Sequence, residues 1–268
     1  MRKWINKSNF LFAFRFSPLI IKMWLLFRPS VNKELKIKKA FYKSTFNQNV
    51  VLERNILIFD VGANEGFITN IFLTLGYNVI SVEPDTHNIN ILKQRFKNEK
   101  KVTIEPVALG KNEGKEKIFI AENEHTLTTL STKWKVILEN KTRRNRHEFI
   151  DDEKWVSVST LNKLIDNYGL PYYAKIDAEG FELEILKGLN KTIPLISFEG
   201  ILPEFALETI ACIHHLNEIN NLYRYNISLD NKFLSQHFCT KNEVIEGINS
   251  VQNCTVEIFC SVAPRISA

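Results

Sequence analysis

The stretch NILIFDVGANEGFITNIFLTLGYNVISVEPD, residues 55–85, decides the fold of this chain of 268 residues. It opens with an apolar, β-branched run at residues 56–59, which predicts a strand buried on both faces. A glycine turn follows at residues 62–66, and then a segment with helical periodicity that ends near Gly76. A second apolar run at residues 79–82 leads into Glu83. Strand, glycine turn, helix and strand predict the first βαβ unit of a nucleotide-binding α/β fold.

The glycine spacing of the turn restricts the ligand. A dinucleotide fingerprint places three glycines in the pattern G-x-G-x-x-G, but counting from Gly62 the later two positions hold Asn64 and Phe67. A phosphate-binding P-loop requires Lys and then Ser or Thr after its last glycine, where this chain has Phe67 and Ile68. The turn therefore favours a nucleoside ligand that lacks a pyrophosphate.

Two acids extend this interpretation. Glu83 follows Gly62 at close to the roughly 20-residue spacing at which an acid meets the ribose hydroxyls. Asp60 ends the first strand, where it and the turn can receive a cationic amino-acid group. S-adenosylmethionine combines a nucleoside with a cationic amino-acid portion, so we expect this cofactor.

Four ordered motifs then show a family resemblance. DVGANEGFIT at residues 60–69, VEP at 82–84, KIDAEGFE at 175–182 and LKG at 186–188 resemble the FkbM-type methyltransferases, over roughly residues 55–199. Asn162 stands where family members commonly have Asp, and we expect little consequence. The resemblance implies methyl transfer from S-adenosylmethionine, with a sugar or glycan hydroxyl or a secondary metabolite as acceptor.

The expected cofactor residues come from both lines of reasoning. The end of a third strand near residue 107 is placed to flank the adenine ring, and the alternative is a strand that simply ends in small residues. The resemblance favours the adenine role. The full set of expected cofactor-binding residues is Asp60, Gly62, Ala63, Asn64, Gly66, Glu83, Pro84, Val107 and Ala108.

Carboxylates are the candidate catalytic groups for methyl transfer to a hydroxyl. A hydroxyl acceptor needs a base within hydrogen-bond reach, and we expect Asp177 first and Glu179 second in that role. Both precede a predicted helix, and the alternative is that they merely favour its first turn. Glu199, expected at the end of the next strand, would orient the substrate or join Asp177 at a divalent cation. We do not predict a metal, because three acids in series do not establish one.

The alternation of strands and helices predicts one doubly wound, mostly parallel α/β sheet. The resemblance adds the antiparallel edge of class I methyltransferases, formed by strands at residues 223–229 and 256–262. Residues 122–152 are polar and weakly periodic, so we expect a long loop. Its basic cluster at residues 141–147 is either a solvated face or a contact for an acidic substrate.

We expect residues 1–48 to form a helical extension before a methyltransferase domain at residues 49–268. No apolar run in it approaches the roughly 20 residues of a spanning helix. Two interpretations remain for it. One is a pair of helices that pack on the domain. The other is a basic, aromatic anchor at a membrane surface, with Trp4 and Trp24 at interface depth.

Composition limits the partners and the compartment. A formal net charge of +5 is too small to indicate nucleic acid, so we expect a small-molecule or glycan acceptor. The four cysteines show no C-x-x-C spacing and indicate reduced thiols in a cytoplasmic protein, with peripheral contact to the inner membrane surface as the alternative. The sequence does not indicate the oligomeric state.

Three rival functions are kept. A nicotinamide-dependent oxidoreductase would use the same βαβ unit, although the second glycine is missing. A non-catalytic binding subunit would retain the cofactor without turnover. An RNA methyltransferase is the weakest of the three, because no surface that combines aromatic and basic residues is legible.

Overall fold

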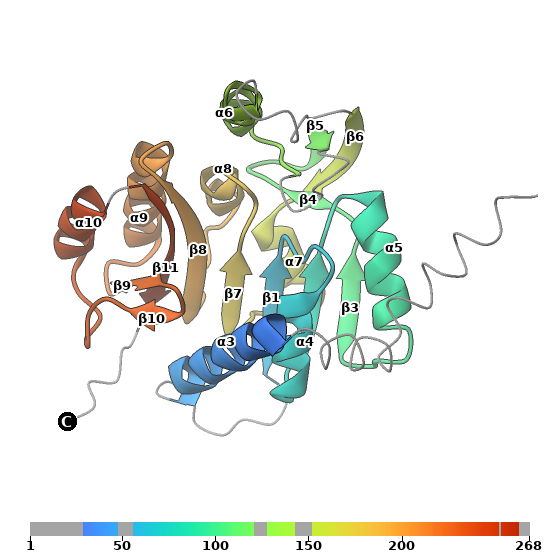
Figure 1. Cartoon of the computed structure of the whole chain (residues 1–268), viewed down its shortest axis with the longest axis horizontal. Helices are drawn as coiled ribbons and strands as arrows, with labels where there is room; N and C mark the ends of the chain where they lie inside the picture. The colour runs from blue at the N-terminus through green and yellow to red at the C-terminus, as the bar shows by residue number, and fades with distance from the viewer. Residues whose placement is uncertain (1–28, 48–55, 121–127, 143–151, 252, 263–268) are drawn as a thin grey trace, which may run out of the picture.

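The computed structural model describes residues 29–47, 56–120, 128–142, 152–251 and 253–262. Its centre is an eight-stranded sheet in the order β10-β9-β11-β8-β7-β1-β2-β3 (Figure 1). The strands are β1 (Leu57–Val61), β2 (Asn78–Val82), β3 (Val102–Glu105), β7 (Tyr173–Ile176), β8 (Leu195–Leu202), β9 (Arg224–Leu229), β10 (Lys232–Phe233) and β11 (Cys254–Ser261).

The sheet has a parallel part and an antiparallel edge. β3, β2, β1, β7 and β8 run parallel, whereas β11 lies antiparallel between β8 and β9, and β10 pairs antiparallel with β9. The doubly wound class I methyltransferase architecture and its antiparallel edge are therefore confirmed. The carboxyl ends of the parallel strands point to one edge, the upper one in Figure 1, and ligands of such sheets bind at that edge.

Helices cover both faces of this sheet because each presents one apolar side. α4 (Phe67–Thr74) and α5 (Thr86–Arg95) follow β1 and β2, and α3 (Pro29–Asn47) lies beside α4. The main core joins the sheet to four further helices, which are α7 (Leu161–Tyr168), α8 (Glu182–Lys187), α9 (Ala206–Ile219) and α10 (Lys241–Ser250).

The described part of the N-terminal extension packs on the domain. α3 buries Phe41, Tyr42 and Phe46 against an aromatic cluster that includes Phe72 and Tyr173. This agrees with the packing interpretation for residues 29–47. The anchor residues Trp4 and Trp24 lie outside the described residues, so that interpretation stays a prediction. No helix in the described ranges is long and apolar enough to cross a membrane.

A small second sheet, not expected from the sequence, lies over the carboxyl edge of the main one. It has the order β4-β6-β5, from β4 (Ala108–Leu109), β6 (Asp152–Ser159) and β5 (Gly114–Ile120). The third strand was expected to continue through residue 107, but β3 ends at Glu105. The chain then leaves the main sheet, and Ala108 pairs with Val158 of β6 instead.

Two segments expected to be loops or links contain helices. Residues 122–152 include α6 (Thr132–Thr142), whose Trp134 and Leu138 pack against Phe205. The link before the last strand contains β10 and α10, and α10 begins with a capping box between Thr240 and Glu243. Residues 143–147 of the basic cluster lie outside the described residues, so its two interpretations stay predictions. All four cysteines are free thiols, as expected.

Candidate active site

The glycine turn after β1 is held by backbone contacts. Gly62 and Ala63 both donate their N–H groups to the Val82 carbonyl at 3.0 Å, which fastens the turn to the end of β2. Gly62 has a φ of +78°, and a Cβ placed there would lie 1.7 Å from the Asp177 carbonyl oxygen. Only glycine fits this approach, so the position couples the first of the four motifs to the third, which contains Asp177.

Glu83 holds the other side of the same turn. Its Oε2 accepts the Asn64 N–H and its Oε1 accepts the Asp85 N–H, both at 2.8 Å. The side chain is buried, and this desolvation raises its pKa to about 7. Because each carboxylate oxygen has a further lone pair, Glu83 can still accept hydroxyl groups of a ligand.

These elements enclose a cavity of about 390 Å³ at the carboxyl edge of the sheet. The cavity is lined by most residues that the sequence predicted for cofactor and chemistry: Gly62, Ala63, Asn64, Glu83, Pro84, Val107, Ala108, Asp177 and Glu179. It is also lined by residues that sequence reasoning missed, among them Phe67, Ile68, Asn88, Ile118, Thr128, Leu130, Lys175, Phe181 and Ile185. We call this space the cofactor cavity.

Two predicted cofactor residues do not line this cavity. Asp60 is buried below it, where its Oδ2 accepts the Thr69 hydroxyl at 2.6 Å. Burial raises the pKa of Asp60, and the nearby Lys175 opposes that rise. Gly66 instead lets the turn pack on α5, because a Cβ there would lie 2.6 Å from Leu92 and Phe96. Both residues support the turn from behind.

The chemistry of the cavity fits a nucleoside. Asn88 Oδ1 and Thr128 Oγ1 are buried and have no hydrogen-bond partner among the described residues, so each leaves a polar atom for a ligand. Asn88 is also close enough to hydrogen-bond with Glu83 and thereby lower the pKa of that acid. Apolar side chains such as Val107 and Phe181 offer walls for a flat ring.

Three carboxyl groups meet beside the cofactor cavity, and two of them line it. Asp177, Glu179 and Glu199 each place a carboxylate oxygen within 4.8 Å of the other two. Asp177 follows β7 and pairs with the Lys175 ammonium at 2.5 Å. The sequence prediction that these three acids belong to one site agrees with their position, and their oxygen set is one that a hard cation can use.

The environment of the acids sets their protonation. Burial first, and then Asp177 and Glu182, raise the pKa of Glu179 to about 8. Burial and the same crowding raise the pKa of Glu199 well above its usual value. Glu179 has a φ of +51°, and its backbone carbonyl accepts the Thr129 hydroxyl at 2.7 Å. The loop after β7 is therefore fixed by the segment over the carboxyl edge.

One expectation about Glu199 was wrong. It was placed at the end of a strand, but β8 continues through Leu202, because β11 pairs with it along its whole length and Glu257 lies opposite Glu199. The side chain still reaches the cluster, since Lys175, Ser197 and Glu199 share one face of the sheet.

Three comparisons with known proteins were made. The family model described as "Methyltransferase FkbM domain" matches residues 60–218. No curated protein matches the chain. Among solved structures, the plantazolicin methyltransferase BpumL in complex with SAH is 9% identical, covers 92% of this chain and 91% of its own, and has a TM-score of 0.46. The precorrin-6y C5,15-methyltransferase from Geobacter metallireducens GS-15 is also 9% identical, covers 85% and 86%, and has a TM-score of 0.44.

The family match spans more than half of the 268 residues. The chain therefore belongs to the FkbM methyltransferase family.

Proposed function

We propose that this member of the FkbM methyltransferase family is an O-methyltransferase that uses S-adenosylmethionine to methylate a hydroxyl group of a sugar, a glycan or a secondary metabolite. The observation that supports this most directly is the continuity of the cofactor cavity with Asp177 and Glu179. A nucleoside-binding wall and two candidate bases face the same space. An acceptor hydroxyl can therefore meet a base and the methyl group together.

The turn and its surroundings would bind the cofactor. Glu83 and Asn88 would receive the ribose hydroxyls, and Val107 and Ala108 would flank the adenine. Among the described residues that line this cavity, Lys175 is the only cation, and it is paired with Asp177. A pyrophosphate would find no unpaired ammonium there, which favours S-adenosylmethionine over a dinucleotide.

The acids would receive the proton. The bound cofactor supplies a methyl group on a sulfonium, so that the new O–C bond forms as the S–C bond breaks and its electron pair stays on sulfur. Asp177 is our first candidate to take the hydroxyl proton, and Lys175 fixes its orientation. Glu179 is the second candidate, because a pKa near 8 suits a base at neutral to mildly alkaline pH. Glu199 would orient the acceptor.

A transfer assay with tritium in the methyl group of S-adenosylmethionine tests this proposal on a panel of hydroxyl acceptors. Replacing Asp177 by Asn should lower the transfer rate about 100-fold or more. Asp166→Asn is the matched control, because Asp166 is an exposed acid that pairs with Lys191 on the surface. Transfer that survives Asp177→Asn unchanged would contradict the assigned base, and a panel without any methylated hydroxyl would contradict O-methylation.

A further inference from the structure

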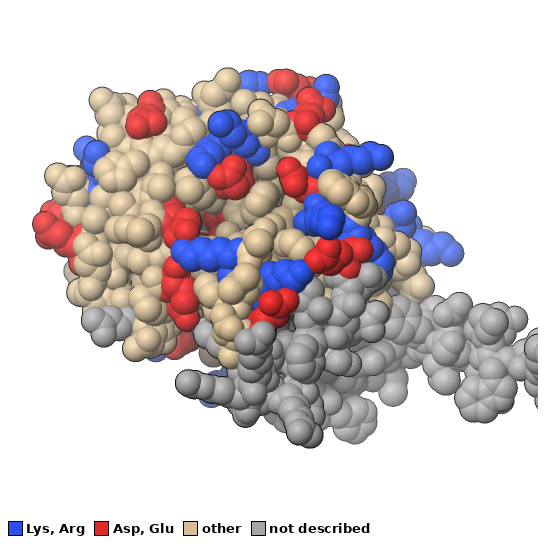
Figure 2. All heavy atoms as spheres, turned by 90° about the horizontal axis from the view of Figure 1, so that it is seen from above, with Lys and Arg blue, Asp and Glu red and all other residues tan. Residues whose placement is uncertain are grey.

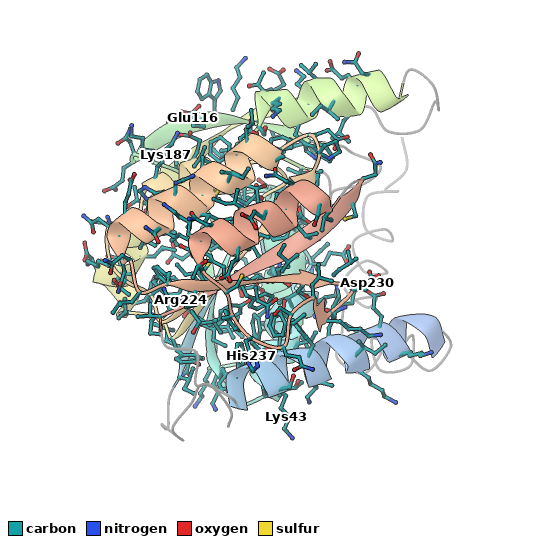
Figure 3. The ribbon with its side chains drawn as sticks, turned by 90° about the vertical axis from the view of Figure 1, so that its left-hand side faces the viewer. Lys43, Glu116, Lys187, Arg224, Asp230 and His237 are labelled. Atoms are coloured by element: carbon teal, nitrogen blue, oxygen red, sulfur yellow. The ribbon has the colours of Figure 1, made fainter. Side chains whose placement is uncertain are left out.

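A second cavity of about 260 Å³ adjoins the cofactor cavity. Its walls come from elements that are far apart in the sequence. α3 contributes Glu34 and Lys38, the turn after β9 contributes Asp230, and the start of β11 contributes Thr255 and Glu257. Figure 3 shows Asp230 lying over one end of α3. The extension before the methyltransferase domain thus forms part of a cavity at the carboxyl edge.

The two cavities meet at the candidate base. Ile68, Lys175 and Asp177 line both of them. Glu199 lines only the second cavity, although its carboxyl group lies within 4.8 Å of those of Asp177 and Glu179. A molecule in the second cavity would therefore reach Asp177 from a space next to the cofactor, and a transfer between two bound molecules requires such neighbouring sites.

The lining of the second cavity is polar and acidic in excess. Its two ammonium groups are each paired with a carboxylate, Lys38 with Glu34 at 3.4 Å and Lys175 with Asp177 at 2.5 Å. Three further acids remain, namely Glu199, Asp230 and Glu257, and burial raises the pKa of Glu199 and of Glu257, which favours their neutral forms. On the surface around the carboxyl edge, acidic and basic side chains are intermixed (Figure 2). No unpaired ammonium group is left among the described residues of the lining, so the cavity offers no counter-charge to phosphate or carboxylate groups on a ligand.

The same lining suits a sugar. Carboxylates, Asn231, Ser228 and Thr255 can bond several hydroxyl groups. Ile68, Ile176 and Val256 add apolar contact for the carbon face of a ring. A few polar groups beside an apolar wall are typical of small-molecule sites.

We propose that this second cavity is the acceptor site, that it takes a sugar without phosphate or carboxylate groups, and that α3 supplies one of its walls. The assignment rests on the proposed function and adds to it the place and the charge of the acceptor.

The position of the acceptor site is tested by a substitution that fills the second cavity. Thr255 is exposed at its lining, and Thr255→Trp should lower methyl transfer to sugars at least about tenfold while S-adenosylhomocysteine binds as in the wild type. Thr103→Trp is the matched control, since Thr103 is an exposed strand residue that lines neither cavity. Unchanged transfer in Thr255→Trp would overturn the assignment. If the wild type itself does not bind S-adenosylhomocysteine, the proposed cofactor is overturned instead.

The contribution of α3 has its own control. Lys38→Ala should lower kcat/KM for the sugar severalfold by opening the α3 wall, whereas Lys43→Ala should not, because Lys43 points away from the protein in Figure 3. Neither residue is in the core, so both variants should fold. Equal effects of the two substitutions would overturn the role of α3.

The predicted absence of charge on the acceptor is tested with three ligands that share one sugar ring: methyl glucoside, its 6-phosphate and methyl glucuronide. Calorimetric titration into the S-adenosylhomocysteine complex should show binding of methyl glucoside, and binding of the two anions at least about tenfold weaker. Preference for either anion would overturn the assignment, and so would failure of all three to bind while S-adenosylhomocysteine does.

Discussion

The cofactor cavity and the second cavity, which we call the acceptor cavity after its proposed role, share one edge of the sheet but are assembled differently. The polar wall of the cofactor cavity, made by the turn, Glu83 and Asn88, lies within residues 60–88, and backbone N–H groups fix the turn and Glu83, while residues up to Ile185 complete the lining. The acceptor cavity draws residues from position 34 to position 257, and side-chain ion pairs and packing fix them. The proposed polar contacts to the cofactor therefore come from one local segment, whereas the proposed contacts to the acceptor depend on elements joined only by the complete fold.

The largest effect is expected on the cofactor side. Gly62→Ala places a methyl group against the Asp177 carbonyl at a φ of +78°, and we expect it to abolish S-adenosylhomocysteine binding and to cost more than about 4 kcal/mol of folding free energy. Gly76→Ala is the control. It has a φ of +97° with nothing within 4 Å, so it should cost only about 1–2 kcal/mol. Calorimetry and urea unfolding measure both, and equal losses would contradict the close approach.

The next effect is expected on the acceptor side. Phe46 of α3 is buried against Phe72 and Tyr173, so Phe46→Ala should reduce the free energy of unfolding by about 3 kcal/mol. Ile37→Ala on the same helix should change it by less than about 0.5 kcal/mol, because Ile37 is 43% exposed. If urea unfolding shows no loss in Phe46→Ala, α3 does not belong to the folded domain.

A smaller effect is expected on the affinity for S-adenosylhomocysteine when a single side chain that faces the cofactor cavity is removed. Asn88 Oδ1 has no partner in the described part of the chain, so Asn88→Ala should weaken S-adenosylhomocysteine about tenfold through one lost hydrogen bond. Asn90 is exposed on the same helix, and Asn90→Ala should leave the affinity unchanged. Titration calorimetry decides, and equal affinities for the two variants would remove Asn88 from the cofactor site.

The smallest effect is on stability as the pH changes. The pKa values of Glu83, Glu182 and Glu179 are raised to about 7, 7 and 8, so the folded protein binds more protons than the unfolded chain between their ordinary values near 4.5 and these values. Stability is therefore lost as pH rises through that window.

Without ligand, the melting temperature at pH 8.5 should be lower than at pH 6 by roughly 5 °C. Glu179→Gln should reduce the difference, because a neutral amide does not titrate. Differential scanning calorimetry measures this, and a melting temperature that rises over the interval would contradict the raised pKa values.

The same division explains what could be predicted from the sequence. The sequence predicted the first βαβ unit, which comprises β1, the turn, α4 and β2. It did so because apolar runs, Gly62 and Glu83 follow each other at spacings that local geometry imposes. Asn88 was missed, although it stands only five residues after Glu83. α10 was missed despite its Thr240–Glu243 capping box, a signal that could have been used.

Other features had no such signal. α6 was hidden because its buried face is narrow, with Trp134 and Leu138 set among charged residues. The extension of β8 past Glu199 depends on the partner strand β11, which lies more than fifty residues away. The acceptor cavity could not be predicted either, since nothing local relates Lys38 to Asp230.

One measurement tests the central claim most directly: titration calorimetry of S-adenosylhomocysteine, with NADH in parallel, into the wild type and Glu83→Ala. We expect one S-adenosylhomocysteine per chain, little NADH binding, and an affinity at least about tenfold weaker in Glu83→Ala, because Glu83 both fastens the turn and faces the ligand. No S-adenosylhomocysteine binding to the wild type, tighter binding of NADH, or an unchanged affinity in Glu83→Ala would contradict the account.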